Sequence, residues 1–445
     1  MKGGVILFRG SGVAARRYVE ADRSGADEYY LGADKAVAEY AALDGAGEVT
    51  AARSLSADEY EGWVDWISSE SGESMGTPRR AGVRSKGSPL FAEMTINAPK
   101  SLSVAAALHP EVSDALDNAQ QDALAEIRRW LGQHSVTRVG PRDAREVVPI
   151  EQMQVVAIRH KTSRAGDPHR HIHMQIGTRV WAAGKWRALD TAALFTQQGA
   201  IRALGTAVIA AHPELAEALN RHGLTLDPVS GEVLELEPFN AVMSKRSAQI
   251  RRNLDRLEAE WETAHPGEEL GPVMTARLQG IAWSYQRPGK KPADLKNEQW
   301  WQQELQDAGY NPDRLPRREM PAPVSLDDLG VHEVASRALD RCAAATSTWT
   351  PHTVQEHVTR ITTEAGVQAT PTELREFVTL ATGLAVGDCF SVLPPDAATP
   401  EHVAHLTSVG VLAAETALRD QLASAMPERE PKHPDVATSA QAAGL

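Results

Sequence analysis

The clearest pattern of hydrophobic and polar positions lies over residues 155–177. Two apolar runs flank the polar stretch KTSRAGDP, and its Gly, Asp and Pro residues are turn formers. The pattern therefore predicts two strands that fold back as an antiparallel hairpin. Because alternate residues of a strand share a face, His171 and His173 are predicted to project together. The turn is expected to bring His160, which leaves the first strand, beside them.

Shorter patterns predict further elements. Residues 3–9 are expected to form a buried strand, and residues 91–96 are expected to form another. Glu93 would lie on one face of the second strand. Residues 31–90 are predicted to hold helical patches, followed by a loop rich in Gly, Ser and Arg. The remaining predictions are helices over 56–68, 111–133, 191–220 and 239–264, and hairpins over 178–190 and 223–236.

The chain of 445 residues is too long for one ordinary core, so more than one domain is expected. Its net charge of -13 is uneven: residues 301–445 hold 10 Lys plus Arg against 20 Asp plus Glu, or -10, which leaves -3 for residues 1–300. We predict four segments: a catalytic domain over 1–311, a Pro-rich linker over 312–324, a small acidic helical domain over 325–425 and a disordered tail over 426–445.

Composition also excludes some classes of protein. No run of about 18 apolar residues occurs, which argues against a membrane span, and the first residues do not have the pattern of a secretion signal. Cys342 and Cys389 give no disulfide framework, which indicates a reducing cytoplasm. No GxxxxGK[ST] motif is present, so no ATP-driven motor is expected.

Residues 151–200 hold 7 basic against 3 acidic residues. A polyanion could approach this basic region, although a merely solvated face would have the same composition. The peptide WSYQRPGKKPADL also carries Arg287, Lys290 and Lys291. With the neighbouring Trp283 and Tyr285 it could hold a single nucleic-acid strand, or the two aromatic residues could serve in core packing.

Four of the fifteen histidines fall within fourteen residues. Imidazole is a common metal ligand, and three converging nitrogens leave positions on an ion for substrate. The alternative is a set of surface histidines on a wet sheet edge. Alternation places His169 and His171 equally well on the face that carries His173. The pattern alone therefore does not decide which of these two histidines is the third ligand. Glu93 is costly in an apolar strand unless it is paired, and a ligand histidine is its natural partner.

Three of the seven tyrosines, Tyr18, Tyr29 and Tyr30, lie in the first thirty residues. Amphipathic packing would explain them. A tyrosine can also act as a nucleophile, and with phosphorus it forms a covalent ester.

These features together resemble the MobF-class conjugative relaxases, the TrwC-like members of the HUH endonuclease superfamily. The resemblance rests on the early tyrosines, on Glu93 two places before TINAPKS, and on RHKTSR followed by DPHRHIH and GKWRALD. It covers about residues 1–310. It implies an α+β fold, with a central antiparallel sheet flanked by helices and a small, mostly helical C-terminal domain.

The resemblance also implies roles for single residues. His160, His171 and His173 match the metal ligands, and His169 becomes a neighbour of the site. Glu93 stands where the family has a supporting aspartate, and Val19 stands where it often has a second tyrosine. The matched nucleophiles are Tyr18, then Tyr29, with Tyr30 beside it. Candidate DNA contacts are Lys100, Arg159, Lys161, Arg287, Lys290 and Lys291.

The implied activity is metal-dependent nicking and rejoining of single-stranded DNA at a plasmid transfer origin, through a 5'-phosphotyrosyl intermediate. Mg or Mn is the expected cofactor. Accessory transfer-origin proteins, a coupling protein and type IV secretion machinery are expected partners in a bacterial cytoplasm. Family members often continue into a helicase; residues after 320 are expected to be a remnant or truncated start of it, so a separate helicase would be needed. The alternatives are a rolling-circle replication initiator, a degenerate single-stranded DNA-binding module and a hydrolase that uses water.

Overall fold

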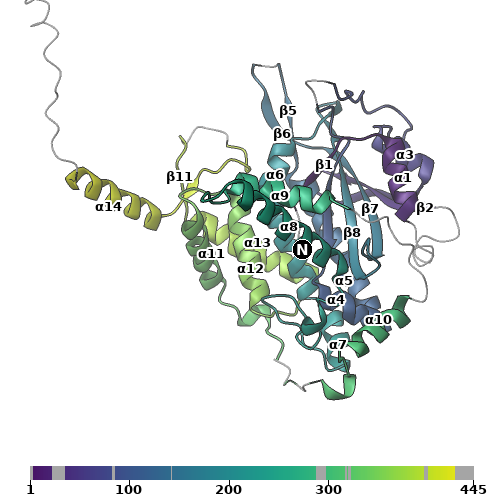
Figure 1. The fold of residues 1–445 in the computed structure, drawn as a ribbon. Coiled ribbons are helices and arrows are strands. Elements are labelled where there is room, and N and C mark those ends of the chain that lie inside the picture. The colour runs from purple at the N-terminus through teal and green to yellow at the C-terminus, as the bar shows by residue number, and fades with distance from the viewer. Residues whose placement is uncertain are drawn as a thin grey trace, which may run out of the picture.

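The computed structural model describes residues 4–22, 36–82, 86–141, 143–286, 297–315, 318, 322–394 and 399–425. A large antiparallel sheet with helices on both faces occupies one part of the molecule, and helices near the C-terminus pack beside it (Figure 1). The predicted α+β class, with a central antiparallel sheet, is therefore confirmed.

The large sheet has eight strands in the order β1-β4-β8-β7-β2-β3, with β9 on β7 and β10 on β9. Two small ribbons, β5–β6 and β11–β12, lie outside it. The strands are β1 (Ile6–Phe8), β2 (Ala36–Asp44), β3 (Val49–Ser56), β4 (Phe91–Asn97), β5 (Val136–Val139), β6 (Glu146–Pro149), β7 (Gln152–Thr162), β8 (Pro168–Gly177), β9 (Arg179–Ala182), β10 (Lys185–Ala188), β11 (Phe390–Ser391) and β12 (Leu406–Thr407).

The central hairpin of the sheet is the predicted one, β7 with β8. Its register pairs His160 with His171 across the two strands. The turn closes through a hydrogen bond from the Ser163 amide to the Asp167 carbonyl, 2.8 Å long. Gly166 has a φ of +84° there, a conformation that side chains disfavour. The predicted hairpin over 178–190 is also present, as β9 and β10.

Two other local predictions need correction. Residues 31–90 were predicted to hold helical patches and no strand, but the structure has β2 and β3 there. The β2 sequence AVAEYAALD is rich in helix-forming Ala, but it lies between two partner strands and most of it is buried, so packing overrides propensity. Residues 223–236 form a single bridge between Leu226 and Val233 where a hairpin was predicted.

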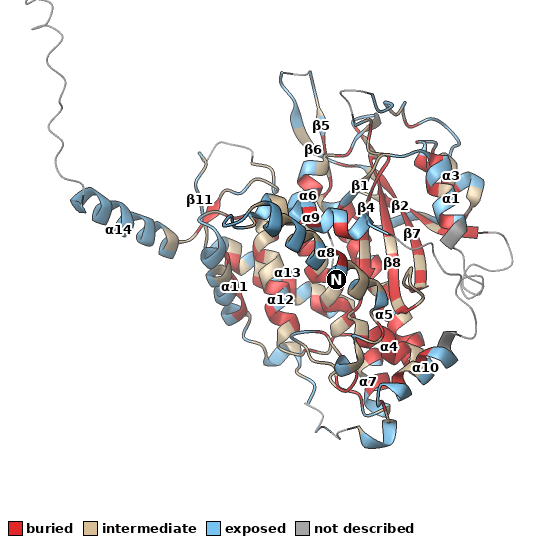
Figure 2. Cartoon of the chain, viewed as in Figure 1, coloured by how far each residue is buried: buried red, intermediate tan, exposed pale blue. Residues whose placement is uncertain are grey.

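The helices divide between the two faces of the sheet. One face packs on α4 (Lys100–Leu108), α5 (Pro110–His134) and α6 (Thr191–Ala210), and its core includes Met94, Ile172 and Met174. The opposite face packs on α1 (Gly12–Asp22) and α3 (Ala57–Val64), and its core includes Val156 and Ile158. Figure 2 shows buried residues running along these strands.

The remaining helices are α7 (Pro213–Arg221), α8 (Lys245–Ala264), α9 (Pro272–Ser284), α10 (Asn297–Asp307), α11 (Val331–Ala345), α12 (Pro351–Glu364), α13 (Pro371–Gly387) and α14 (Val409–Ala425), with short 3-10 turns at 237–239, 312–314 and 326–328. The α8 helix thus begins six residues after the predicted start at 239. Among the described helices, none is long and apolar enough to cross a membrane.

The C-terminal helices share a core with the sheet region. Helix α12 packs along α6, and its Val358 and Ile361 belong to the same hydrophobic cluster as the α6 residue Ile201. The predicted linker over 312–324 and the boundary after residue 311 remain predictions. Helix α14 projects from the rest of the protein and is largely exposed (Figures 1 and 2).

Candidate active site

Three histidines gather at one end of the β7–β8 hairpin. The ring centroids of His160 and His171 lie 5.2 Å apart, those of His160 and His173 also 5.2 Å, and those of His171 and His173 5.0 Å. They lie on the face of the sheet covered by α1 and α3, because they alternate with residues of the opposite core such as Ile172 and Met174. The hairpin thus brings together all three residues that the sequence singled out as ligands.

Hydrogen bonds determine which ring nitrogen is protonated in two of them. Nδ1 of His171 lies 2.9 Å from the carbonyl oxygen of His169, and Nδ1 of His173 lies 3.0 Å from Oε1 of Glu93. A carbonyl and an ionised carboxylate only accept hydrogen bonds, so each Nδ1 carries the proton. The Nε2 atom of each ring therefore keeps a lone pair, which is the arrangement typical of metal-binding histidines.

Burial favours the neutral form of His160 and His171. It lowers the pKa of His160 to about 3, with help from the neighbouring His173 and His169, and holds the pKa of His171 well below its ordinary value. A neutral imidazole is the form that binds a metal ion. The residues present therefore fit a divalent ion. His169 stacks on His171 with ring centroids 4.5 Å apart, as a neighbour within the same cluster.

Glu93 lies in β4, next to β8, and links the histidines to a buried polar chain. Gln175 donates to Oε2 of Glu93 at 3.1 Å, and the Tyr60 hydroxyl donates to Oε1 of Gln175 at 2.8 Å. Burial acts to raise the pKa of Glu93, but the hydrogen bonds from His173 and Gln175 outweigh it and lower that pKa. Glu93 is therefore ionised and holds His173 in place. Gln175 was not predicted from the sequence, although it lies two residues after His173 on the same face.

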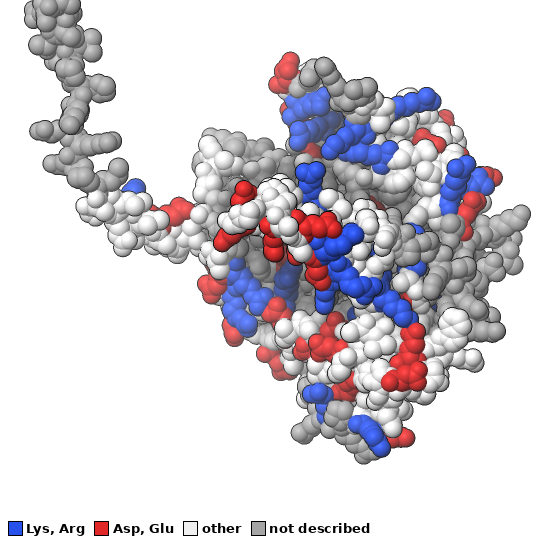
Figure 3. Space-filling view, viewed as in Figure 1, with Lys and Arg blue, Asp and Glu red and all other residues white. Residues whose placement is uncertain are grey.

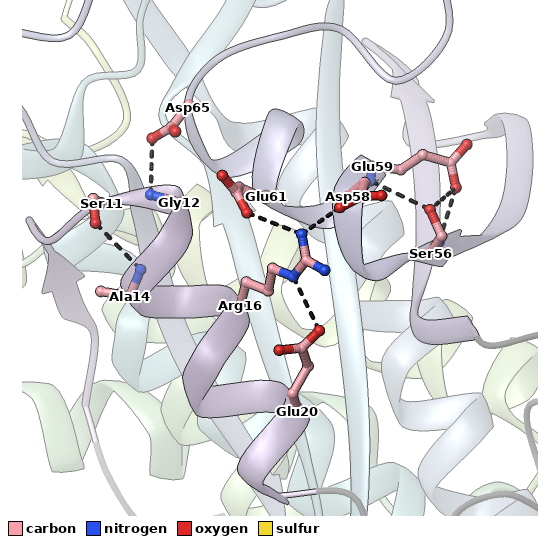
Figure 4. Close-up of polar contacts among 10 residues, drawn as sticks. All are labelled: Ser11, Gly12, Ala14, Arg16, Glu20, Ser56, Asp58, Glu59, Glu61 and Asp65. Atoms are coloured by element: carbon pink, nitrogen blue, oxygen red, sulfur yellow. Dashed lines mark hydrogen bonds and ion pairs between the residues drawn. The ribbon is translucent and has the colours of Figure 1, made fainter.

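Helix α1 carries Tyr18 and is held on α3 by polar contacts (Figure 4). The Arg16 guanidinium bonds to Glu20 at 3.0 Å and to Glu61 at 3.3 Å, and it also contacts Asp58. The Gly12 amide donates to the Asp65 carboxylate at 2.9 Å. A Cβ atom at Gly12 would lie 2.6 Å from both Asp65 Oδ2 and the Glu61 carbonyl oxygen, so this close approach requires glycine.

Tyr18 lies at the edge of the histidine face. Its side chain is 39% exposed, and the guanidinium carbon of Arg164, from the β7–β8 turn, lies 5.7 Å from its ring centroid. Tyr18 also lies close enough to Tyr60 to interact with it electrostatically. The pKa of Tyr60 is raised chiefly by burial. The structure thus brings Tyr18 to the hairpin that carries the three histidines. Tyr29 and Tyr30 lie outside the described residues.

The candidate DNA contacts differ in their surroundings. Lys100 donates from Nζ to the Pro168 carbonyl at 2.7 Å, and burial lowers its pKa to about 8. Arg159 bonds to Glu39 at 3.0 Å and contacts Gln121 of α5, so it is directed to the face opposite the histidines. Lys161 follows His160 in β7 and is half-buried. The three candidates within residues 287–291 lie outside the described part of the chain.

A basic surface lies along part of α8. Figure 3 shows Lys and Arg side chains in a band over this helix, with acidic side chains near it. The helix is tied to the hairpin turn, because Lys245 forms ion pairs with the buried Asp167 at 3.5 Å and with Glu304 at 2.7 Å. Arg256 stacks over Tyr285 at 4.3 Å.

Comparison with known proteins identifies the family and the fold. No curated protein sequence matches the chain. The structure is similar to that of conjugative relaxase TrwC in complex with OriT DNA: the metal-free form is 21% identical with a TM-score of 0.50, and the metal-bound form is 20% identical with a TM-score of 0.51. Each match covers 69% of this chain and 99% of that one, and shows a shared fold. A family model described as TrwC relaxase matches residues 13–308, so the chain belongs to the TrwC relaxase family.

Proposed function

We propose that this relaxase cuts and rejoins single-stranded DNA at a plasmid transfer origin through a covalent bond to Tyr18. The observation that carries the proposal is the shared face: three clustered imidazoles and the α1 helix with its partly exposed tyrosine lie on the same side of the sheet. The family membership supports the reaction class. The related TrwC was solved with OriT DNA, which supports the same kind of substrate.

His160, His171 and His173 would hold the divalent ion, which we expect to be Mg or Mn. When bound, such an ion would offset the negative charge that develops on the scissile phosphate and orient it for in-line attack. The relative TrwC has been solved in a metal-bound form. Glu93 acts through His173: by accepting its Nδ1–H, it keeps Nε2 available as a ligand. Gln175 and Tyr60 in turn hold Glu93.

Tyr18 would supply the nucleophile. Its phenolic oxygen forms a bond to phosphorus, the bond from phosphorus to the 3' oxygen breaks, and the tyrosine proton is lost as the leaving oxygen gains one. The products are a 5'-phosphotyrosyl protein and a free 3'-hydroxyl end. One phosphate ester replaces another, so the step can run backwards and rejoin the strand. A second tyrosine, Tyr29 or Tyr30, would take part when the strand is closed.

Two groups are suited to hold the DNA backbone near this centre. Lys100 lies beside the start of β8 and Arg164 beside Tyr18, so both could contact phosphates close to the cut. The exposed basic residues of α8, Arg251 and Arg252, could bind the strand further away, because phosphate contacts need charge and reach. Accessory transfer-origin proteins, a coupling protein and a separate helicase remain expected partners.

The test is incubation with Mg or Mn and single-stranded oligonucleotides from the transfer origin of the encoding plasmid. We expect cleavage that leaves a free 3'-hydroxyl on one fragment and protein on the 5' end of the other. Chelation should abolish cleavage, and cleavage that persists in metal-depleted buffer would overturn the metal assignment. A free 5'-phosphate without bound protein would instead favour a hydrolase that uses water.

A further inference from the structure

A second group of potential metal ligands lies far from the histidine hairpin. His134 ends α5, His352 lies in the first turn of α12, and Glu401 lies in the segment before β12. One donor atom from each can be chosen so that all lie within 4.8 Å of one another. The three residues come from parts of the chain more than 200 residues apart at the extremes, so packing of the C-terminal helices on the sheet region creates the cluster.

The distances suit a small ion. Oε2 of Glu401 lies 2.9 Å from Nδ1 of His134 and 3.7 Å from Nε2 of His352. Two ligands at the usual distances from a tetrahedral zinc ion are about 3.3 Å apart. The observed separations lie on either side of that value, so small side-chain adjustments would bring the three atoms into coordination. Two imidazoles and one carboxylate also form a ligand set that zinc commonly takes.

An unsatisfied nitrogen points to a missing partner. His352 is only 2% exposed, and its buried Nε2 has no hydrogen-bond partner among the described residues. A buried polar atom without a hydrogen bond destabilises the folded protein, so an ion that binds this nitrogen would remove that penalty. The cluster also lines a cavity of about 340 Å³, which leaves room for an ion and water. His402 lines the same cavity and could add a fourth ligand.

Surrounding residues hold the cluster in position. The buried Gln197 of α6 donates to the His134 carbonyl at 2.8 Å and accepts from the Trp130 indole at 3.2 Å. The Trp130 ring packs against His134, with centroids 4.0 Å apart, and against His352 at 5.3 Å. No Lys or Arg is among the described residues that line the cavity, so no cation there competes with a metal ion.

We propose that His134, His352 and Glu401 bind a divalent transition metal ion, with Zn²⁺ the best fit, and that this ion fastens the C-terminal helices to the relaxase core. This site is structural: it joins α5, α12 and the 399–402 segment, and it contains none of the residues proposed for DNA cleavage. An ordinary His134–Glu401 ion pair is the competing explanation, but it leaves Nε2 of His352 without a hydrogen bond.

The test uses the full chain with the first centre disabled by His171→Ala and His173→Ala, stripped of metal and titrated with Co²⁺. Four-coordinate Co²⁺ has intense visible absorption, and we expect one equivalent to bind and to be displaced by Zn²⁺. On this background, His352→Gln and Glu401→Gln should each weaken Co²⁺ binding by at least about tenfold. Loss of a supporting contact already weakens metal binding by about that factor, and loss of a ligand should weaken it further. The exposed His332 offers a matched control, His332→Gln, which should bind as the background does.

Circular dichroism and thermal unfolding of the metal-free variants show whether each is folded. We expect Zn²⁺ to raise the unfolding temperature of the background and of His332→Gln, but not of the two ligand variants. Absence of Co²⁺ binding to the folded background would overturn the proposal. So would binding that both ligand substitutions leave unchanged.

Discussion

The two histidine clusters differ in how the chain builds them. His160, His171 and His173 lie on two adjacent strands joined by a short turn, and hydrogen bonds from Nδ1 already orient two of the three rings. His134 and His352 come from separate helices and meet only after the C-terminal helices pack on α6. The first cluster lies beside a helix that carries a tyrosine, whereas the second joins two helices and a loop from distant parts of the chain. We therefore propose a catalytic role for the first cluster and, for the second, a structural role in joining the C-terminal helices to the sheet region.

The largest expected effect separates these two roles. His171→Ala should lower the rate of DNA cleavage by about 100-fold or more, because charge stabilisation by the ion is worth several kcal/mol. His352→Gln should leave cleavage nearly unchanged and should lower the unfolding temperature of the zinc-loaded protein. The measurements are single-turnover cleavage and thermal unfolding of both variants. If His352→Gln were as inactive as His171→Ala while still folded, the division of roles would be wrong.

Glu93 is the residue proposed to orient His173 in the first cluster. Glu93→Ala should weaken Mn²⁺ binding by about 10–100-fold, because it removes the acceptor that orients His173. Glu93→Asp, which keeps the carboxylate, should recover part of this affinity. Mn²⁺ titration followed by electron paramagnetic resonance measures both variants. Equal affinity of the Ala variant and the parent protein would show that His173 is oriented without Glu93.

Helix α1 allows the proposed nucleophile, Tyr18, to be displaced without a change to the proposed metal ligands. Gly12→Ala places a Cβ atom against Asp65 and the Glu61 carbonyl, so α1 must shift and carry Tyr18 with it. We expect cleavage to slow by about tenfold, since a small misplacement of a reacting group is costly, and Mn²⁺ affinity to stay the same. Gly280→Ala is a comparison variant, because Gly280, like Gly12, has no positive φ but has open space around its Cβ position. A Gly12→Ala protein with full activity would contradict the proposed role of this docking contact.

The smallest expected effect is the pH dependence of stability in the second cluster. Burial, together with His134 and His402, lowers the pKa of His352 to about 4, although Glu401 acts to raise it. Between pH 6.5 and 4 the unfolded chain binds a proton at His352 that the folded, metal-free protein does not, so stability falls as the pH is lowered. His352→Gln should make this fall shallower by about 1 kcal/mol.

Urea unfolding of the metal-free protein and of His352→Gln between pH 6.5 and 4 measures that difference. His332→Gln again serves as the control, since this histidine is exposed. Parallel curves for the parent protein and His352→Gln would show that His352 binds its proton as readily in the folded protein as in the unfolded chain.

The sequence predicts the first cluster well because its chemistry is local. Two-residue alternation places His171 beside His173, and a turn of Gly, Asp and Pro brings His160 to them. The same alternation could have identified Gln175. By contrast, β2 was missed because its Ala-rich sequence favours a helix until two neighbouring strands pair with it.

Features made by tertiary packing could not be predicted in this way. The docking of α1 through Gly12 and Arg16 depends on where α3 lies, and neither residue has a distinctive sequence signal. The second cluster depends on the approach of residues as distant as His134 and Glu401. Arg159 was a candidate DNA contact from its place beside His160, but strand alternation turns its side chain to the other face, where Glu39 pairs with it.

The most direct test of the central claim is the mass of the covalent product. After reaction with a cleavable transfer-origin oligonucleotide and Mn²⁺, proteolysis and mass spectrometry should find the 5' fragment attached to the peptide that contains Tyr18. Tyr18→Phe should lose this adduct while it still binds the oligonucleotide. An adduct on Tyr29 or Tyr30 in the parent protein, or undiminished adduct formation by Tyr18→Phe, would contradict the assignment of Tyr18 as the nucleophile.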